Sequence, residues 1–191
     1  MIYETIVTSV DAMGVPHVAP FGISMQDSLV VISPYKPSST MANILASHHA
    51  VMNLTDDVRV FAAALTGRSA WNLVAADKVV GVRLGTCLAH KELKLVDVVD
   101  HPLRPQLFLQ VEHEVQHQAF QGFNRAQAAV IELAVLVSRL TRLPMDKIEQ
   151  EIGYLHIAIE KTAGPSELEA WSWLMEAVTN HQAMLNNENL A

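Results

Sequence analysis

A loop in the first quarter of the chain combines side chains that bind phosphate with the start of a predicted helix. Lys36 supplies a cation, and Ser38, Ser39 and Thr40 supply hydroxyl groups just before a helix expected over 41–47. The N-terminus of a helix presents unpaired backbone N–H groups and a partial positive charge, both of which attract anions. Serine and threonine at this position also serve as ordinary helix caps. The local chemistry therefore leaves two interpretations open, a phosphate site and a capped helix after a proline-rich loop.

The segment 113–117 reads H-E-V-Q-H and matches the H-E-x-x-H pattern of zinc proteases. That chemistry needs both histidines on one face of a helix. Here the string ends a strand pattern, because apolar residues alternate with polar ones over 107–112. Residues four apart on a strand lie about 13 Å from each other, too far to share one zinc ion. We therefore interpret Glu112, His113, Glu114 and His117 as an exposed or interfacial strand edge.

Other short motifs give no further chemistry. The G-x-S-x-G, G-x-x-x-x-G-K-[ST] and G-x-G-x-x-G patterns are absent from the sequence. The remaining histidines show no spacing typical of metal ligands. Cys87 is the single cysteine, so no internal disulfide can form, and we expect it to be a buried small hydrophobic residue. No metal site is predicted.

The elements that must position these residues change character along the chain. Strands are expected over 5–10, 15–24, 29–33, 49–54, 84–99 and 106–117, with a loop over 67–78. Helices are expected over 41–47, 58–65, 125–140, 144–161 and 165–186. A run of strands followed by a run of helices is typical of an α+β fold. We therefore predict a β-rich domain over 1–118 and a C-terminal helical region over 119–191.

The predicted helix 125–140 is apolar on almost every side. A helix of this kind is usually buried all round. A chain of 191 residues can hardly surround it alone, and half of the residues are hydrophobic. We therefore expect the helical region to pack on the β-rich domain and to form a subunit interface.

Composition excludes several classes of protein. With 13 basic and 20 acidic residues, the net charge of −7 argues against a nucleic-acid-binding surface. The apolar runs are too short for a transmembrane helix, and residues 1–4 do not resemble a signal peptide. We expect a cytoplasmic protein without a membrane partner.

Three motifs together resemble the FMN-binding split barrels, which include flavin reductases and relatives of pyridoxamine-phosphate oxidase. They are P-H-V-A-P at 16–20, K-P-S-S-T-M-A-N-I at 36–44 and V-M-N at 51–53. The whole chain resembles a narrower branch, domain of unknown function 447. Its motifs are M-I-Y-E-T at 1–5, N-L-T-D-D-V at 53–58, G-F-N-R-A-Q-A-A-V-I-E at 122–132 and K-T-A-G-P at 161–165.

The resemblance implies a six-stranded antiparallel split β-barrel and a homodimer that holds FMN between its subunits. On the matching positions of this sequence, Lys36, Ser39 and Thr40 would bind the phosphate. Asn43 would steady the loop.

Two further groups of residues would lie at the flavin according to the same resemblance. Backbone groups of Asn53, Leu54 and Thr55 would follow the edge of the isoalloxazine ring. Pro20, Phe21 and Gly22 would line the pocket from the neighbouring strand.

The implied function is an oxidoreductase of the flavin reductase type, in which NAD(P)H reduces the flavin and an unknown small molecule accepts the electrons. The branch also suggests a link to one-carbon metabolism with tetrahydromethanopterin. No residue is required as a catalytic acid or base, which is compatible with an enzyme because a flavin carries its own hydride chemistry. Two alternatives stay open, a non-catalytic flavin-binding or flavin-sensing protein and a flavin-free interaction module.

Three further side chains have open roles. Arg125 and Glu132 lie two turns apart on one helix face, and we favour buried interfacial ion pairs for them over a contact of Arg125 with flavin or substrate. Trp71 either covers the flavin ring or anchors its loop.

Overall fold

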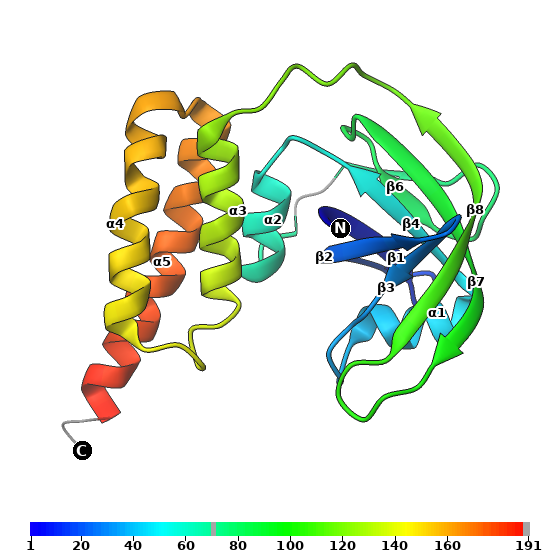
Figure 1. Cartoon of the computed structure of the whole chain (residues 1–191), viewed down its shortest axis with the longest axis horizontal. Helices are drawn as coiled ribbons and strands as arrows, with labels where there is room; N and C mark the ends of the chain where they lie inside the picture. Colours follow the sequence, from blue (N-terminus) through cyan, green and yellow to red (C-terminus); the bar gives the residue numbers. More distant parts are fainter. Residues whose placement is uncertain (70–71, 189–191) are drawn as a thin grey trace. The chain divides into compact units, whose positions relative to one another are not determined.

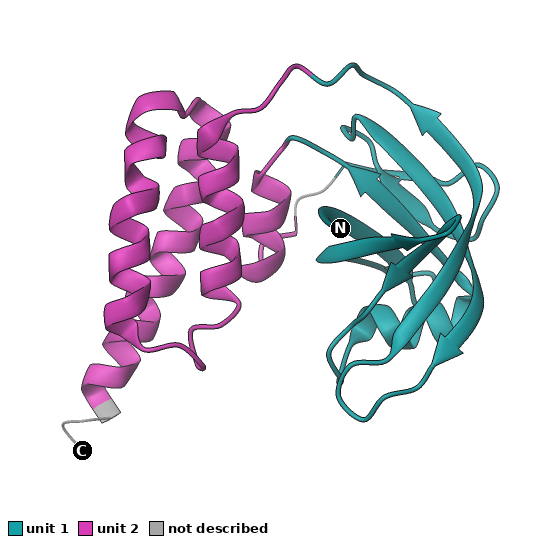
Figure 2. Ribbon diagram, in the orientation of Figure 1, with its two compact units in different colours: residues 1–56, 71–120 teal, residues 57–70, 121–191 magenta. Residues whose placement is uncertain are grey.

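The chain forms two compact units (Figure 2). The computed structural model describes residues 1–69 and 72–188. The first unit, here called the barrel unit, comprises residues 1–56 and 71–120, and the second, the helical unit, comprises residues 57–70 and 121–191. Residues 57–70 thus belong with the C-terminal helices, although they lie between strands in the sequence.

The barrel unit is a closed antiparallel barrel (Figure 1). Its strands, among the described residues, are β1 (Ile2–Val10), β2 (Pro16–Gln26), β3 (Leu29–Ile32), β4 (His49–Leu54), β7 (Ala89–Val99) and β8 (Gln106–Gln116). Around the barrel they follow the order β1-β2-β3-β8-β7-β4, and β4 closes it by pairing with β1. The predicted α+β class and six-stranded antiparallel barrel are confirmed.

The first hairpin shows how the sequence sets the barrel. The carboxylate of Asp11 accepts backbone N–H bonds from Met13 and Val15, each at 2.8 Å. Gly14 adopts a φ of +81°, which a residue with a side chain rarely reaches. This turn pairs β1 with β2 from Ile2↔Ser24 to Val10↔Pro16. The register places alternate residues of β1 toward the interior.

The core lies inside the barrel and includes one helical residue. Helix α1 (Ser39–Ser47) packs against β1, β2 and β4 and inserts Ile44 among the strand side chains. The buried core residues are Val7, Ile23, Val30, Ile32, Ile44, Ala50, Met52, Leu93, Leu107 and Leu109.

A small hairpin that the sequence patterns did not indicate covers part of the barrel's outer face. It consists of β5 (Leu73–Ala75) and β6 (Val82–Leu84), where we expected a loop and the start of one long strand. The long strand is interrupted at Gly85, whose N–H donates to the carbonyl of Asn72 at 2.8 Å. A Cβ at Gly85 would lie 2.5 Å from the Asn72 side chain, so this close approach requires glycine. Strand β6 contacts β1 and β4.

The helical unit consists of α2 (Arg59–Leu65), α3 (Arg125–Val137), α4 (Met145–Thr162) and α5 (Pro165–Glu188), close to the predicted ranges. The side chain of Asn124 caps α3 by accepting from the N–H of Ala126 at 2.7 Å. Helix α3 packs against α2, α4 and α5. No helix within the described ranges is long and apolar enough to cross a membrane.

Helix α3 looks apolar on almost every side in the sequence, but the single chain buries one face of it and leaves another exposed, as the expected subunit interface requires. Its buried residues are Ala126, Ala129, Val130, Leu133, Ala134 and Val137. Arg125, Ala128 and Glu132 are exposed on the opposite face. Alanine accounts for the difference, because its small side chain makes a helix look apolar in sequence without filling space around it. The subunit interface expected here stays a prediction.

Candidate functional site

The predicted phosphate loop leads directly into α1. The hydroxyl of Ser38 accepts the backbone N–H of Met41 at 3.2 Å, so Ser38 is the helix cap. The helix begins at Ser39, two residues earlier than expected. Ser39 is exposed, whereas Thr40 is 1% exposed. Of the predicted phosphate ligands in the first turn, Ser39 therefore has the accessible hydroxyl.

Lys36 joins this loop to the loop between β7 and β8. Its ammonium nitrogen lies 2.8 Å from a carboxylate oxygen of Asp100, and its backbone N–H donates to the carbonyl of Leu103 at 2.9 Å. The hydrogen bond from Lys36 and its positive charge lower the pKa of Asp100. The ion pair is exposed, so water screens it, and an anionic ligand could compete with Asp100 for Lys36.

A second cation that the sequence analysis did not single out lies beside Lys36. Arg104 donates from Nε to the carbonyl of Ser33 at 3.0 Å, and its guanidinium carbon lies 5.0 Å from the centre of the Tyr35 ring. The Nδ1 of His101 accepts the backbone N–H of Arg104 at 3.0 Å. The loop after β3 thus holds the side chain of Arg104, and His101 holds its backbone. The guanidinium has further N–H groups that can donate to a ligand.

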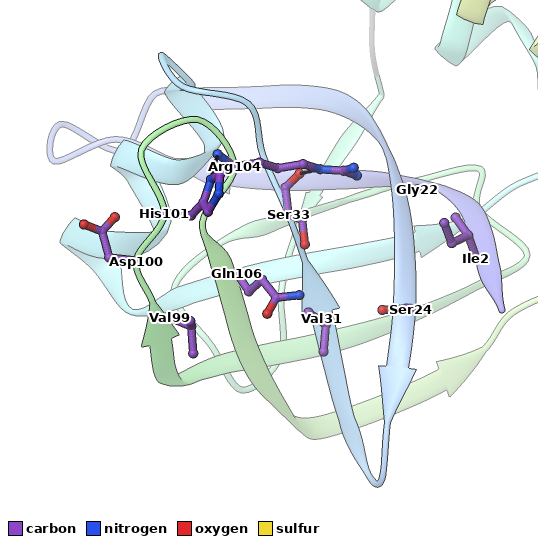
Figure 3. A pocket seen from close by; sticks show the side chains of 10 residues that line it. All are labelled: Ile2, Gly22, Ser24, Val31, Ser33, Val99, Asp100, His101, Arg104 and Gln106. Carbon is purple, nitrogen blue, oxygen red and sulfur yellow. Dashed lines mark hydrogen bonds between the residues drawn. The ribbon is translucent and has the colours of Figure 1, made fainter.

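These loops border a pocket of about 280 Å³ on the outer side of β2 and β3 (Figure 3). Its lining residues are Ile2, Gly22, Ser24, Val31, Ser33, Val99, Asp100, His101, Arg104 and Gln106. In Figure 3, Arg104 extends over Ser33, and the carboxylate of Asp100 points away from them. The pocket therefore combines the cation Arg104 at its edge with a strand surface that is partly apolar and partly polar.

Of the residues predicted at the flavin, Gly22 is the one that lines this pocket. A Cβ at Gly22 would lie 2.9 Å from Cγ2 of Ile2 and 3.2 Å from a carboxylate oxygen of Glu4. The missing side chain at Gly22 thus makes room for the side chains of Ile2 and Glu4 from the paired strand β1. Pro20 and Phe21, predicted beside it, are not among the lining residues, and Phe21 packs against the barrel core.

The predicted asparagines have internal roles. Asn43 donates to the hydroxyl of Ser9 at 3.1 Å and so ties α1 to β1, consistent with a residue that steadies the loop. Asn53 is fully buried, donates to the carbonyl of Ile6 at 3.2 Å and accepts from the N–H of Leu84 at 2.8 Å. The side chain of Asn53 thus joins β1, β4 and β6.

Leu54 lines a different hollow from Gly22. This hollow, of about 390 Å³, is bordered by Tyr3, Glu4, Thr5, Ile23, Met25, Met52, Leu54 and Lys91. Thr55 follows β4 and is partly exposed. The structure therefore brings Lys36 and Gly22 to one region of the barrel unit and places Leu54 at another hollow.

A layer of buried polar side chains lies near the covering hairpin. Glu92 on β7 is fully buried and accepts backbone N–H bonds from Asp77, Lys78 and Val79 at 2.6, 2.6 and 2.9 Å. Burial alone would raise the pKa of Glu92, but these bonds and the contact with His90 outweigh it, so the pKa is lowered. Glu92 is therefore a carboxylate that holds the segment 77–79 against the barrel.

His90 connects this carboxylate to two further side chains. Its Nε2 lies 3.2 Å from Glu92, and its Nδ1 lies 2.9 Å from Nε2 of His117. Cys87 is fully buried, as predicted. Its sulfur lies within 4.8 Å of one ring nitrogen of His90 and of His117. Burial raises the pKa of the Cys87 thiol, and burial lowers the pKa of His117.

The H-E-x-x-H string lies on β8 and just beyond its end, so no metalloprotease helix is formed. The interpretation of His117 as a simple strand edge is incomplete, because its ring faces the buried His90. Antiparallel pairing explains this, since His90 pairs with Val115 and the neighbours of Val115 flank His90 diagonally. Pairing the two predicted strands 84–99 and 106–117 as an antiparallel hairpin would have placed His90 near His113 and His117, and so would have indicated this histidine group from the sequence.

Comparison with known protein families gives the relationship of the whole chain. A model described as the N-terminal domain of a protein of unknown function (DUF447) matches residues 3–118, and the corresponding DUF447 C-terminal model matches residues 124–176. The chain belongs to the DUF447 family. A comparison with curated protein sequences found no match.

Solved structures relate this DUF447 protein to flavin-associated folds. An FMN-bound DUF447 protein from Methanosarcina mazei has a TM-score of 0.79 and 20% identity, over 92% of this chain and 94% of that one. Flavoredoxin from Methanosarcina acetivorans has a TM-score of 0.54 and 11% identity, over 63% and 73% of the chains. Component B of nitrilotriacetate monooxygenase from Mycobacterium thermoresistibile has a TM-score of 0.52 and 22% identity, over 62% and 70%. At these identities the likeness shows the fold.

Two remaining sequence candidates of the DUF447 protein lie on the helical unit. Arg125 and Glu132 are exposed on α3 and border a hollow of about 270 Å³ with Ala128 and Tyr154. Their burial by a second subunit stays a prediction. Trp71 lies outside the described residues.

Proposed function

We propose that this DUF447 protein binds FMN and is an oxidoreductase of the flavin reductase type. The observation that carries the proposal is the family relationship to an FMN-bound protein whose fold matches over 92% of this chain. The pocket adds suitable local chemistry, because Arg104 lines it and Lys36, from the loop that leads into α1, pairs with the lining residue Asp100.

The residues present fit the phosphate of FMN. Lys36 and Arg104 supply two positive charges, Ser39 supplies an accessible hydroxyl, and the first turn of α1 supplies backbone N–H groups. The nearly complete burial of Thr40 favours a supporting role in the turn over direct contact. Lys36 would exchange Asp100 for the phosphate when the ligand binds.

The strand side of the pocket supplies apolar contacts for the ring of FMN. Ile2, which packs over Gly22, and Val31 from β3 both line it. A volume of about 280 Å³ is at the lower limit of small-molecule sites, which supports a homodimer whose second subunit completes the cavity. When bound, FMN would supply hydride and electron transfer, while the chain binds and orients it.

A nicotinamide test separates the enzyme from a protein that only binds flavin. We expect NADH or NADPH, added without oxygen, to bleach the flavin absorbance of the purified holoprotein. Reoxidation by added small-molecule acceptors would then identify the acceptor class. Dithionite serves as the control, because it reduces accessible flavin without a nicotinamide site.

Bleaching by dithionite but by neither nicotinamide would contradict the reductase part of the proposal. The second candidate, a non-catalytic flavin-binding protein, would then apply. One observation favours that candidate: Nδ1 of His101, which lines the pocket beside Arg104, already accepts the backbone N–H groups of Leu103 and Arg104.

A further inference from the structure

We propose that Cys87, His90 and His117 form a binding site for a zinc ion in the barrel unit. The sulfur of Cys87 and one ring nitrogen of each histidine all lie within 4.8 Å of one another. Ligand atoms around a tetrahedral zinc ion with these donors lie about 3.3–3.6 Å apart, given Zn–N and Zn–S distances near 2.0–2.1 and 2.3 Å. The two histidine nitrogens, 2.9 Å apart, would therefore separate slightly, and the sulfur, within 4.8 Å of a nitrogen of each, would move closer to complete the site.

The surroundings of His90 match those of a metal ligand. Its Nδ1 lies 2.9 Å from Nε2 of His117, while its Nε2 lies 3.2 Å from the carboxylate of Glu92. Histidines that bind metals usually donate their second ring N–H to a carboxylate, which fixes the tautomer and makes the ligand more basic. Three backbone N–H groups hold Glu92 in place for this role.

The contact between the histidines is compatible with a metal ion. With Nε2–H of His90 donated to Glu92, Nδ1 of His90 has a free lone pair, which accepts Nε2–H of His117 at 2.9 Å. On zinc binding, the proton on Nε2 of His117 would move to Nδ1 of the same ring and the Cys87 thiol would release its proton to solvent, so that both facing nitrogens and the thiolate become ligands. His90 and Cys87 are fully buried, whereas His117 is exposed, so His117 can adjust its position and open a route from solvent.

The donor types select the metal. A thiolate and two imidazoles suit zinc and disfavour magnesium and calcium, which prefer oxygen ligands. Three protein ligands leave the fourth position of a tetrahedral ion to water or another molecule.

Asp77, Glu92 and His113 form a neighbouring group. One carboxylate oxygen of each acid and one ring nitrogen of the histidine also lie within 4.8 Å of one another. Both oxygens of Glu92 already accept backbone N–H bonds, which reduces their capacity to bind an ion. We therefore assign Glu92 to the support of His90, and His113 becomes the matched control residue.

The test uses the full chain, with zinc as the probe. The protein is freed of metal with a chelator, dialysed against buffered Zn²⁺ and analysed by elemental mass spectrometry. We expect one zinc per chain in the wild type and in His113→Ala. In His117→Ala the zinc affinity should fall more than the about 10–100-fold that loss of an outer hydrogen-bond partner causes. His117 is exposed, so its removal should leave the fold intact.

A cobalt titration tests the sulfur ligand independently. Co²⁺ bound to a thiolate gives a near-ultraviolet charge-transfer band, and a difference spectrum against the cobalt-free protein cancels any flavin absorbance. We expect the band in the wild type and in His113→Ala, and its loss in Cys87→Ser. Failure of the wild type to retain zinc, or loss of zinc in His113→Ala with retention in His117→Ala, would overturn the proposal. Neither readout depends on flavin, so the result is independent of the proposed function.

Discussion

Replacing Glu92 by alanine is expected to lower the free energy of unfolding of the barrel unit by about 3 kcal/mol. The carboxylate is fully buried and accepts three backbone N–H bonds besides its contact with His90. Hydrogen bonds to a charged group each contribute about 1.5–3 kcal/mol, but the segment 77–79 is partly exposed and can regain water. The net loss is therefore smaller than the sum of the bonds.

Hydrogen exchange of amides in β7 and β8 measures this loss in the barrel unit, because it reports local as well as global opening. An excess of chelator removes any contribution from bound metal. The matched control is Glu112→Ala, which removes an exposed carboxylate from β8 and should change the free energy by less than about 0.5 kcal/mol. Equal effects of the two substitutions would contradict the structural role assigned to Glu92.

The double variant Lys36→Ala/Arg104→Ala is expected to bind FMN about 100-fold more weakly than the wild type. Each cation would lose one charge-assisted contact with the phosphate, at about 1.5 kcal/mol each. A total of about 3 kcal/mol corresponds to about 100-fold in affinity. Both side chains are exposed, so the fold should not change. Fluorescence titration with FMN measures the affinity.

Riboflavin and a second double variant provide the controls. Riboflavin lacks the phosphate, so its affinity should be the same in the wild type and in Lys36→Ala/Arg104→Ala. Lys94→Ala/Lys147→Ala removes two exposed cations elsewhere and matches the change in net charge. Unchanged FMN affinity in the first variant, or an equal loss in the control, would contradict the phosphate assignment.

Local patterns in the sequence predicted the elements of the barrel well. Alternating and apolar runs gave its strands, and the serine-rich loop before residue 41 correctly indicated a helix start. That these strands close into one barrel was predicted from the resemblance to split barrels, because local sequence patterns do not show which strands pair. Asn43 was predicted as a residue that steadies the loop, and its bond to Ser9 is consistent with this.

Features that depend on pairing between distant strands were not predicted. Arg104 becomes a neighbour of Lys36 only when the turn between β7 and β8 is folded against the loop after β3. His90 and His117 meet through the register of two strands that are far apart in sequence. The fully buried polar side chains Asn53 and Glu92 resemble surface residues in sequence, because the covering segment 72–87 buries them and supplies some of their hydrogen-bond partners only in the folded chain.

The measurement that tests the account most directly is an absorbance spectrum of the purified protein, with mass spectrometry of any small molecule that heating releases. The account predicts a flavin spectrum and the mass of FMN, at about one molecule per chain. A colourless protein that also fails to bind added FMN would contradict it, and the barrel would then be a flavin-free interaction module.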